Sequence, residues 1–251
     1  MERIKEIKEE GFLYGYGLFE TINIKNKIPK NLEKHFLRLK SSAMDFNIEF
    51  SLNYDEFKNL FFEEISKYKE NDFILRFTLI KDGDESKYFF NKRSNPYGKE
   101  IYEKGFKVKI SDFLRNENSR LVYYKTLNYM ENYMELLEAR KENYNEVIFF
   151  NSKNYLCEGA ISNIFIISKG IFYTPSLKNG LLKGIMRDEI INKLKAHGEI
   201  IKEENINLKF LIEADEIFIT NSILGIMKVS ELNGKKYSTR VVESLKEKFN
   251  I

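Results

Sequence analysis

The apolar residues in the first part of the chain recur with the periods of successive strands and helices. Alternation along GLFETINIKNKI predicts a strand over residues 17–28 that ends at a turn near Asn26 and Lys27. Apolar residues at helical spacing predict a helix over residues 32–43, with Asn31 as its cap. The other elements expected here are a helix over residues 54–68, a strand over 73–80, a polar loop over 91–100 and a strand over 106–110.

A polar stretch without periodicity, SDFLRNENSR, follows at residues 111–120. Linkers between domains have this character, because few of their side chains are buried. We therefore predict a small N-terminal domain over residues 1–112, a linker over 113–120 and a larger C-terminal domain over 121–251.

The C-terminal part contains clusters of short apolar strands. A helix is expected over residues 128–140, since Asn128 and Glu131 have the spacing of a capping box. Further expected elements are strands over residues 146–150, 163–167, 171–175 and 216–220, a helix after a glycine loop near residue 184, and a final helix. Strands and helices do not alternate regularly, so the pattern indicates two α+β domains with mostly antiparallel sheets.

Composition narrows the class of protein. The 251 residues carry a net charge of +3 with both signs interleaved, which does not indicate nucleic acid or an anionic membrane as a partner. The single cysteine, Cys157, excludes an internal disulfide, and with two histidines it provides no ligand set for a zinc cluster. The charged stretch MERIKEIKEEGF and the lack of a long apolar run predict a soluble, cytoplasmic protein. The small number of cysteines and histidines predicts no metal site.

Five local features could carry chemistry, although each also has an ordinary structural explanation. Lys125 in YYKTLNYMEN lies between an apolar run and a predicted helix, where a solvated turn lysine is the simpler interpretation. Glu158 in CEGAISN lies beside a glycine, as exposed turn glutamates do. KGIMRDE and TNSILG offer backbone N–H groups and hydroxyls to an anion. Arg38 in HFLRLK could form a forked contact with a phosphate or carboxylate, or remain solvated on its helix.

Taken in order, the segments that contain these features resemble a known family. GYGLFET, HFLRLKSSA, KTLNYMEN, CEGAISNIF, TPSLKNGLLKGIMR and ADEIFITNSILGI are similar to the motifs of class IV (fold type IV) pyridoxal-phosphate enzymes, over residues 11–232. This family includes branched-chain aminotransferases, D-amino-acid aminotransferases and 4-amino-4-deoxychorismate lyases. The resemblance implies an α+β fold with a small N-terminal α/β sandwich and a larger C-terminal β-barrel-like domain with flanking helices. It also implies a homodimer.

The resemblance implies roles for individual residues. Lys125 would bind pyridoxal 5′-phosphate as a Schiff base and, once released, take the proton from the substrate carbon that bears nitrogen. We expect aromatic residues such as Tyr123 and Tyr124 to shield this amine from water. Glu158 would face the pyridine nitrogen, and Arg38 would bind the phosphate. The other cofactor-binding residues that the resemblance implies are Ile185, Met186, Thr220, Asn221 and Ser222.

Several positions depart from the family pattern. Tyr16 stands where many members have aspartate, and the short segment before Gly11 shortens or removes the first hairpin. Lys228 stands where a proline is usual. Met186 replaces a threonine or serine that is common in the aminotransferases, and this methionine and the form N-S-x-x-G-I at residues 221–226 resemble the lyase branch.

The sequence therefore predicts a lyase that forms 4-aminobenzoate and pyruvate from 4-amino-4-deoxychorismate, for folate synthesis. One alternative is a branched-chain or D-amino-acid aminotransferase that uses 2-oxoglutarate with the same Lys125 and Glu158. Another is a non-catalytic relative, which the joint presence of Lys125, Glu158 and Arg38 disfavours. Arg93, in the expected polar loop, is a candidate contact for a substrate carboxylate, and a solvated loop arginine is its ordinary explanation.

Overall fold

The computed structural model describes residues 10–249, which form two compact units. The first unit comprises the chain up to Pro96 together with Tyr124–Tyr129, and the second comprises Tyr97–Tyr123 and the chain from Met130 onward. This division differs from the one expected from the sequence, because the polar stretch 113–120 lies inside the second unit. The outer ends of the two expected domains, residues 1–9 and 250–251, lie outside the described residues.

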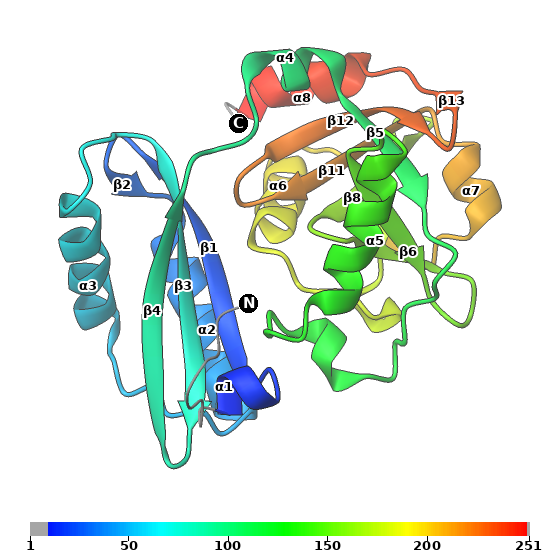
Figure 1. Cartoon of the computed structure of the whole chain (residues 1–251). Coiled ribbons are helices and arrows are strands. Elements are labelled where there is room, and N and C mark those ends of the chain that lie inside the picture. Colours follow the sequence, from blue (N-terminus) through cyan, green and yellow to red (C-terminus); the bar gives the residue numbers. More distant parts are fainter. Residues whose placement is uncertain (1–9, 250–251) are drawn as a thin grey trace. The chain divides into compact units, whose positions relative to one another are not determined.

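The first unit contains an antiparallel sheet with the strand order β2-β1-β3-β4 (Figure 1). Its elements are α1 (Glu10–Leu13), β1 (Gly17–Lys25), β2 (Ile28–Pro29), α2 (Leu32–Asp45), α3 (Tyr54–Ser66), β3 (Phe73–Asp82) and β4 (Glu85–Arg93). The turn between β1 and β2 falls on Asn26 and Lys27, as predicted, and both have positive φ angles. Asn31 precedes α2 as predicted, but within the described residues its side chain forms no capping hydrogen bond.

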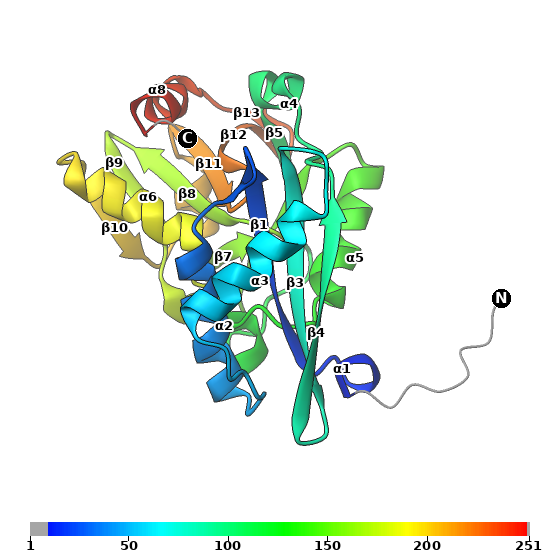
Figure 2. The same ribbon diagram turned by 90° about the vertical axis from the view of Figure 1, so that its left-hand side faces the viewer.

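Helices α2 and α3 cover the same face of this sheet (Figure 2). Phenylalanines from α2, α3 and β3 form the core between them, and the rings of Phe57 and Phe77 lie 5.3 Å apart. Side chains alternate along a strand, so Leu18, Glu20 and Ile22 of β1 face the helices and Phe19 points to the opposite face. The helix-covered face of β1 and its opposite face therefore hold different candidate site residues in place.

Strand β4 corrects the sequence prediction for this part of the chain. Residues 91–93 were expected to begin a polar loop, but Arg93 is the last residue of β4 and pairs with Ile74 of β3. β4 forms an edge of the sheet and most of its side chains are exposed, so it lacks the apolar face that would have revealed it.

The second unit contains a mixed sheet with the strand order β10-β9-β8-β11-β12-β5-β6-β7, and β13 pairs with β12. Its strands are β5 (Phe106–Ile110), β6 (Glu146–Phe150), β7 (Leu156–Gly159), β8 (Asn163–Ser168), β9 (Ile171–Pro175), β10 (Ile201–Glu204), β11 (Glu216–Asn221), β12 (Gly225–Leu232) and β13 (Lys235–Lys236). Its helices are α4 (Lys99–Lys104), α5 (Met130–Lys141), α6 (Ile185–Ala196), α7 (Leu208–Ile212) and α8 (Arg240–Phe249), with short 3-10 turns at Arg120–Tyr123 and Leu177–Asn179. Most strand pairs are antiparallel, as predicted, and β9–β10, β5–β12 and β5–β6 are parallel.

The helices of the second unit cover its sheet. Helix α5 lies over β6 (Figure 1) and packs on it through Leu136 and Ala139. Helices α6 and α8 pack over the stacked rings of Phe165 and Phe218. This packing fixes β7 and the turn to β8 against a rigid core. Within residues 10–249, none of the helices has the length and apolar composition needed to cross a membrane.

Candidate functional site

The residues singled out from the sequence are divided between the two units. Those of the first unit are Arg38, Arg93 and Lys125, and those of the second unit are Glu158, residues 184–186 and residues 220–222.

The backbone around Lys125 is fixed to strand β1. The Phe19 N–H donates to the Lys125 carbonyl at 2.9 Å, and the Leu127 N–H donates to the Gly17 carbonyl at 2.9 Å. The Asn128 side chain donates to the Gly15 carbonyl, and α5 begins at Met130, two residues later than predicted. Lys125 therefore lies in an extended segment whose position is set by β1.

Two aromatic rings lie beside the half-buried Lys125 side chain. The Nζ atom is 4.4 Å from the ring centroid of Phe19 and 5.5 Å from that of Tyr129, and these rings meet edge to face. Such rings attract an ammonium group, which favours its charged form. They also displace water from it, which favours the neutral amine. The sequence pointed instead to Tyr124, whose hydroxyl donates to Asp45, and Tyr123, whose hydroxyl donates to the Glu117 carbonyl.

Arg76 is a further cation beside Phe19 that the sequence did not single out. Its guanidinium lies 3.8 Å from the Phe19 ring centroid, on the ring that also contacts Lys125. Burial lowers the pKa of Arg76, and the charge of Arg93 lowers it further. Arg76 and Arg93 thus form a pair of like charges that an anion would stabilise.

Arg38 forms a buried ion pair with Glu20 on the helix-covered face of β1. Arg38 Nε donates to Glu20 Oε1 at 2.8 Å and Nη2 donates to Oε2 at 2.6 Å, while His35 Nδ1 lies 2.6 Å from Oε2. Burial would by itself raise the pKa of Glu20, but the charges of Arg38 and His35 outweigh it and lower the pKa to about 2. Burial also lowers the pKa of His35, despite the adjacent carboxylate. This arrangement holds the Arg38 guanidinium in one orientation.

Glu158 lies at the end of β7 with its carboxylate buried and hydrogen-bonded. Oε2 accepts from the Leu182 N–H at 3.0 Å and from Asn163 Nδ2 at 3.3 Å. Arg115 Nη2 lies 3.5 Å from Oε1. Glu158 is therefore a fixed carboxylate beside a cation, and not the exposed turn residue of the ordinary explanation.

Arg115 is a buried arginine that sequence analysis missed, because it lies in the polar stretch assigned to a linker. It is 4% exposed, its Nη1 donates to Asn132 Oδ1 at 2.9 Å, and its guanidinium lies 4.4 Å from the ring centroid of Phe149. Its Nε and Nη2 atoms have no hydrogen-bond partner among residues 10–249. No periodicity marks this residue, since its burial depends on strands that lie later in the chain.

The N-terminus of α6 places the backbone N–H groups of Ile185 and Met186 at the end of a twelve-residue helix. Gly184 precedes the helix, and an added Cβ there would lie 1.9 Å from Asn163 Oδ1. Only glycine fits this approach. The N-terminus of α6 thus presents its free backbone N–H groups beside Asn163, as an anion-binding helix start does.

The segment 220–222 combines a buried hydroxyl with a turn that Asn221 holds. The Thr220 hydroxyl is fully buried and has no hydrogen-bond partner in the described part of the chain. Asn221 Oδ1 accepts from the Ile223 and Leu224 N–H groups, and its Nδ2 donates to the Ile161 carbonyl at 3.1 Å. Asn221 thus shapes the turn, which leaves Thr220 and the half-buried Ser222 as the hydroxyls that could meet a ligand.

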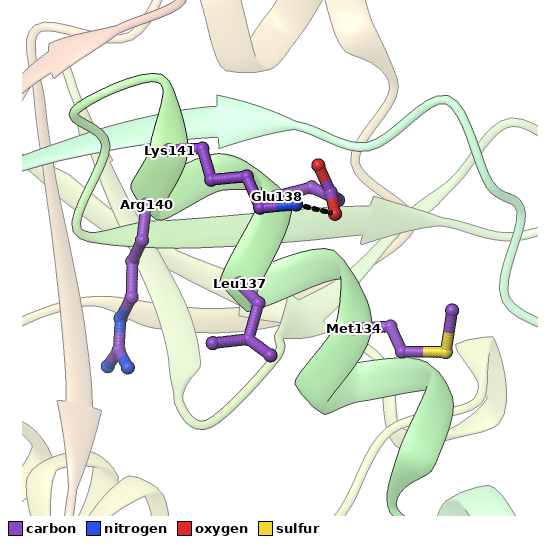
Figure 3. A pocket seen from close by; sticks show the side chains of 5 residues that line it. All are labelled: Met134, Leu137, Glu138, Arg140 and Lys141. Carbon is purple, nitrogen blue, oxygen red and sulfur yellow. Dashed lines mark hydrogen bonds and ion pairs between the residues drawn. The ribbon is translucent and has the colours of Figure 1, made fainter.

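A separate hollow of about 410 Å³ lies beside α5 (Figure 3). It is lined by Met134, Leu137, Glu138, Arg140 and Lys141. Glu138 and Lys141 form an ion pair across one side of it. None of the predicted site residues lines it. In residues 10–249, no group of three or more His, Cys, Asp or Glu side chains is arranged to hold a metal ion.

Comparison with known proteins identifies the family. The family model for amino-transferase class IV matches residues 17–232. The chain belongs to this family.

Several class IV relatives are similar over most of their length. A protein named "Probable branched-chain-amino-acid aminotransferase" from Thermotoga maritima is 31% identical over 86% of this chain and 77% of its own. The aminodeoxychorismate lyase of Bacillus subtilis is 28% identical over 94% of this chain and 84% of its own. A crystal structure of a Legionella pneumophila protein, provisionally named 4-amino-4-deoxychorismate lyase, matches with a TM-score of 0.92 and 26% identity, over 100% of this chain and 96% of that one.

These matches confirm the class IV family, the two-domain fold of type IV and an enzyme that depends on pyridoxal phosphate. Relatives named as aminotransferases and as lyases are both similar to this chain. The family therefore fixes the cofactor, and both reactions occur among its members that are similar to this chain.

Proposed function

We propose that this class IV enzyme is a lyase that converts 4-amino-4-deoxychorismate into 4-aminobenzoate and pyruvate for folate synthesis. The observation that carries the proposal is the Legionella structure, which matches over the full length of this chain with a TM-score of 0.92. Met186 and the N-S-x-x-G-I segment support the same branch. We further propose that the enzyme acts in the cytoplasm as a homodimer.

The residues of the second unit fit pyridoxal 5′-phosphate. The N-terminus of α6 and the buried Thr220 hydroxyl, which has no hydrogen-bond partner within residues 10–249, offer donors to a phosphate. Ile185, Met186 and Ser222 complete this proposed set. Glu158 offers a buried carboxylate to the pyridine nitrogen, and the Arg115 charge stabilises that carboxylate. When bound, the cofactor supplies an electron sink for the charge that develops on the substrate carbon.

Lys125 is the residue that we propose to bind the cofactor covalently and to move the proton. Its amine would accept the proton from the substrate carbon that bears nitrogen. The backbone hydrogen bonds to β1 fix its Cα, and Phe19 and Tyr129 limit the water around Nζ. Arg38, oriented by Glu20, is proposed to bind the phosphate.

Arg76 and Arg93 are proposed to bind the substrate carboxylates. The proposed substrate carries two carboxylates, one on its ring and one on its enolpyruvyl group. Arg76 lies over the Phe19 ring that contacts Lys125, and the charge of Arg93 acts on Arg76. Loss of a proton from the ring then allows the bond to the enolpyruvyl oxygen to break. The enolpyruvyl group leaves as an enolate, takes up a proton to become pyruvate, and the ring gains aromaticity as 4-aminobenzoate.

The experiment that tests this function compares two reactions of the same purified enzyme. Enzymatically prepared 4-amino-4-deoxychorismate should yield pyruvate and 4-aminobenzoate in equal amounts. Valine, leucine and D-alanine, each offered with 2-oxoglutarate, should yield little glutamate. Robust glutamate formation without pyruvate would assign the chain to the aminotransferases, which the Thermotoga match favours.

A further inference from the structure

Glu146, the first residue of β6, carries a carboxylate that is fully shielded from water. The donors to Oε1 are the N–H groups of Val147 (3.0 Å) and Ala160 (3.1 Å), and those to Oε2 are the Ile161 N–H (3.3 Å) and the Ser162 hydroxyl (2.7 Å). Burial raises the pKa of Glu146 to about 7, although these four hydrogen bonds favour its charge. The chain thus keeps an acid at a place where its burial is costly.

Three of the four donors belong to the turn that joins β7 to β8. Gly159 enters this turn directly above the carboxylate, where an added Cβ would lie 2.4 Å from Ser162 Oγ and 3.0 Å from Glu146 Cδ. The glycine of the CEG motif is therefore required because the Ser162 hydroxyl and, behind it, the Glu146 carboxylate leave no room for a Cβ. The turn wraps around the carboxylate and takes its shape from it.

The same turn is linked to each part of the candidate cofactor site in the second unit, by a direct contact or through a residue that adjoins it. Glu158 immediately precedes it. Asn163 immediately follows it, donates to Glu158, and packs against Gly184 at the start of α6. Asn221 donates to the Ile161 carbonyl within the turn. A shift of this turn would move the carboxylate, the helix start and the 220–222 segment relative to one another.

We propose that Glu146 is a positioning residue for pyridoxal phosphate, which acts by fixing the 159–162 turn that joins these three parts. This inference rests on the proposed function, since it assigns the turn to a cofactor site. Glu146 does not touch the cofactor in this proposal. Glutamine in its place keeps the size of the side chain. Its NH2 group, however, cannot accept the hydrogen bonds that one of the carboxylate oxygens now accepts.

Glu216 provides a matched control in the same unit. It is 3% exposed, and its carboxylate accepts from the Ser238 hydroxyl and from the Val241 and Val242 N–H groups at 2.9–3.0 Å. These donors belong to the segment that leads into α8 and to its first turns. Glu216→Gln therefore disturbs a buried, hydrogen-bonded carboxylate that does not hold the 159–162 turn.

The test is a titration of each apo-protein with pyridoxal 5′-phosphate, followed by absorbance and by visible circular dichroism of the bound cofactor. Glu146→Gln should raise the dissociation constant about tenfold or more, the scale on which groups that orient metal ligands act, and should alter the dichroism. Glu216→Gln should bind the cofactor like the parent. Glu146→Gln and Glu216→Gln should both unfold at lower urea concentration than the parent. Ser162→Ala removes one donor, leaves the carboxylate in place, and should weaken binding to a smaller extent.

Parent-like binding and dichroism in both Glu146→Gln and Ser162→Ala would overturn the inference while leaving the proposed function intact. If Glu146→Gln does not fold, Ser162→Ala carries the test by the same two measurements. Equal weakening in Glu216→Gln and Glu146→Gln would also overturn it, since the effect would then be one of general stability. A parent protein that does not bind the cofactor would refute the proposed function, and the inference with it.

Discussion

Replacing Glu20 by glutamine should destabilise the first unit, because this carboxylate is the counter-ion of Arg38 within a buried cluster. Glu20 is 1% exposed, and Arg38 and His35 both contact it at hydrogen-bond distance. In Glu20→Gln the guanidinium loses that counter-ion while its surroundings stay unchanged. An unpaired charge next to a buried site is strongly destabilising.

The size of the loss follows from the pKa of Glu20, which falls from 4.5 to about 2 in the folded protein. One pKa unit corresponds to about 1.4 kcal/mol, so the ionised carboxylate contributes about 3 kcal/mol to the free energy of unfolding at neutral pH. Breaking a buried ion pair typically costs about 3–5 kcal/mol, which agrees with this value. Because the folded-state pKa is lowered, the contribution is present above about pH 4.5 and is lost as the pH falls towards 2.

Urea denaturation of the apo-protein, followed by circular dichroism, measures this loss. Glu20→Gln should unfold with about 3 kcal/mol less stability than the parent at pH 7, and the difference should shrink below about pH 4.5. Glu70→Gln is the matched control in the same unit, because Glu70 pairs with Lys92 at the surface and its removal should have a far smaller effect. A loss below about 1 kcal/mol at pH 7, or a loss equal to that of Glu70→Gln, would refute the reasoning.

Three further predictions concern the cofactor and the substrate. Glu158→Gln should retain pyridoxal phosphate but lose about 100-fold or more in turnover, and a parent-like rate would exclude its electronic role. Arg76→Ala and Arg93→Ala should each raise the KM for 4-amino-4-deoxychorismate, whereas an unchanged KM in Arg93→Ala would identify a solvated arginine. Gly184→Ala places a Cβ 1.9 Å from Asn163 Oδ1, so it should weaken binding of pyridoxal phosphate more than binding of unphosphorylated pyridoxal. If binding of the two ligands were weakened equally, this turn would not be a contact of the phosphate.

Hydrophobic periodicity in the sequence found most of the strands that have a buried face, but it missed the buried strands β7 and β12. The bounds of β5 and β6 are those predicted, because their apolar residues face the core of the second unit. Strand β4 was missed because its side chains are mostly exposed and its pairing with β3 is a long-range contact. An edge strand of this kind has no periodic signal of its own.

The candidate site was predictable where a motif marks it and not where long-range packing creates it. Lys125 and Glu158 were found from their motifs, and Glu158 proves to be buried and hydrogen-bonded. Phe19 and Arg76 come together only through the pairing of β1 with β3, and Arg115 is buried by β6. Sequence spacing contains none of these contacts.

Reduction of the enzyme loaded with pyridoxal phosphate by borohydride, followed by peptide mapping, tests the central claim that Lys125 carries the cofactor. Both the proposed lyase and the alternative aminotransferase depend on this attachment. The account predicts a single stable label on the peptide that contains Lys125, and loss of that label in Lys125→Ala. A label on another lysine with Lys125 unmodified would contradict the assignment of the site.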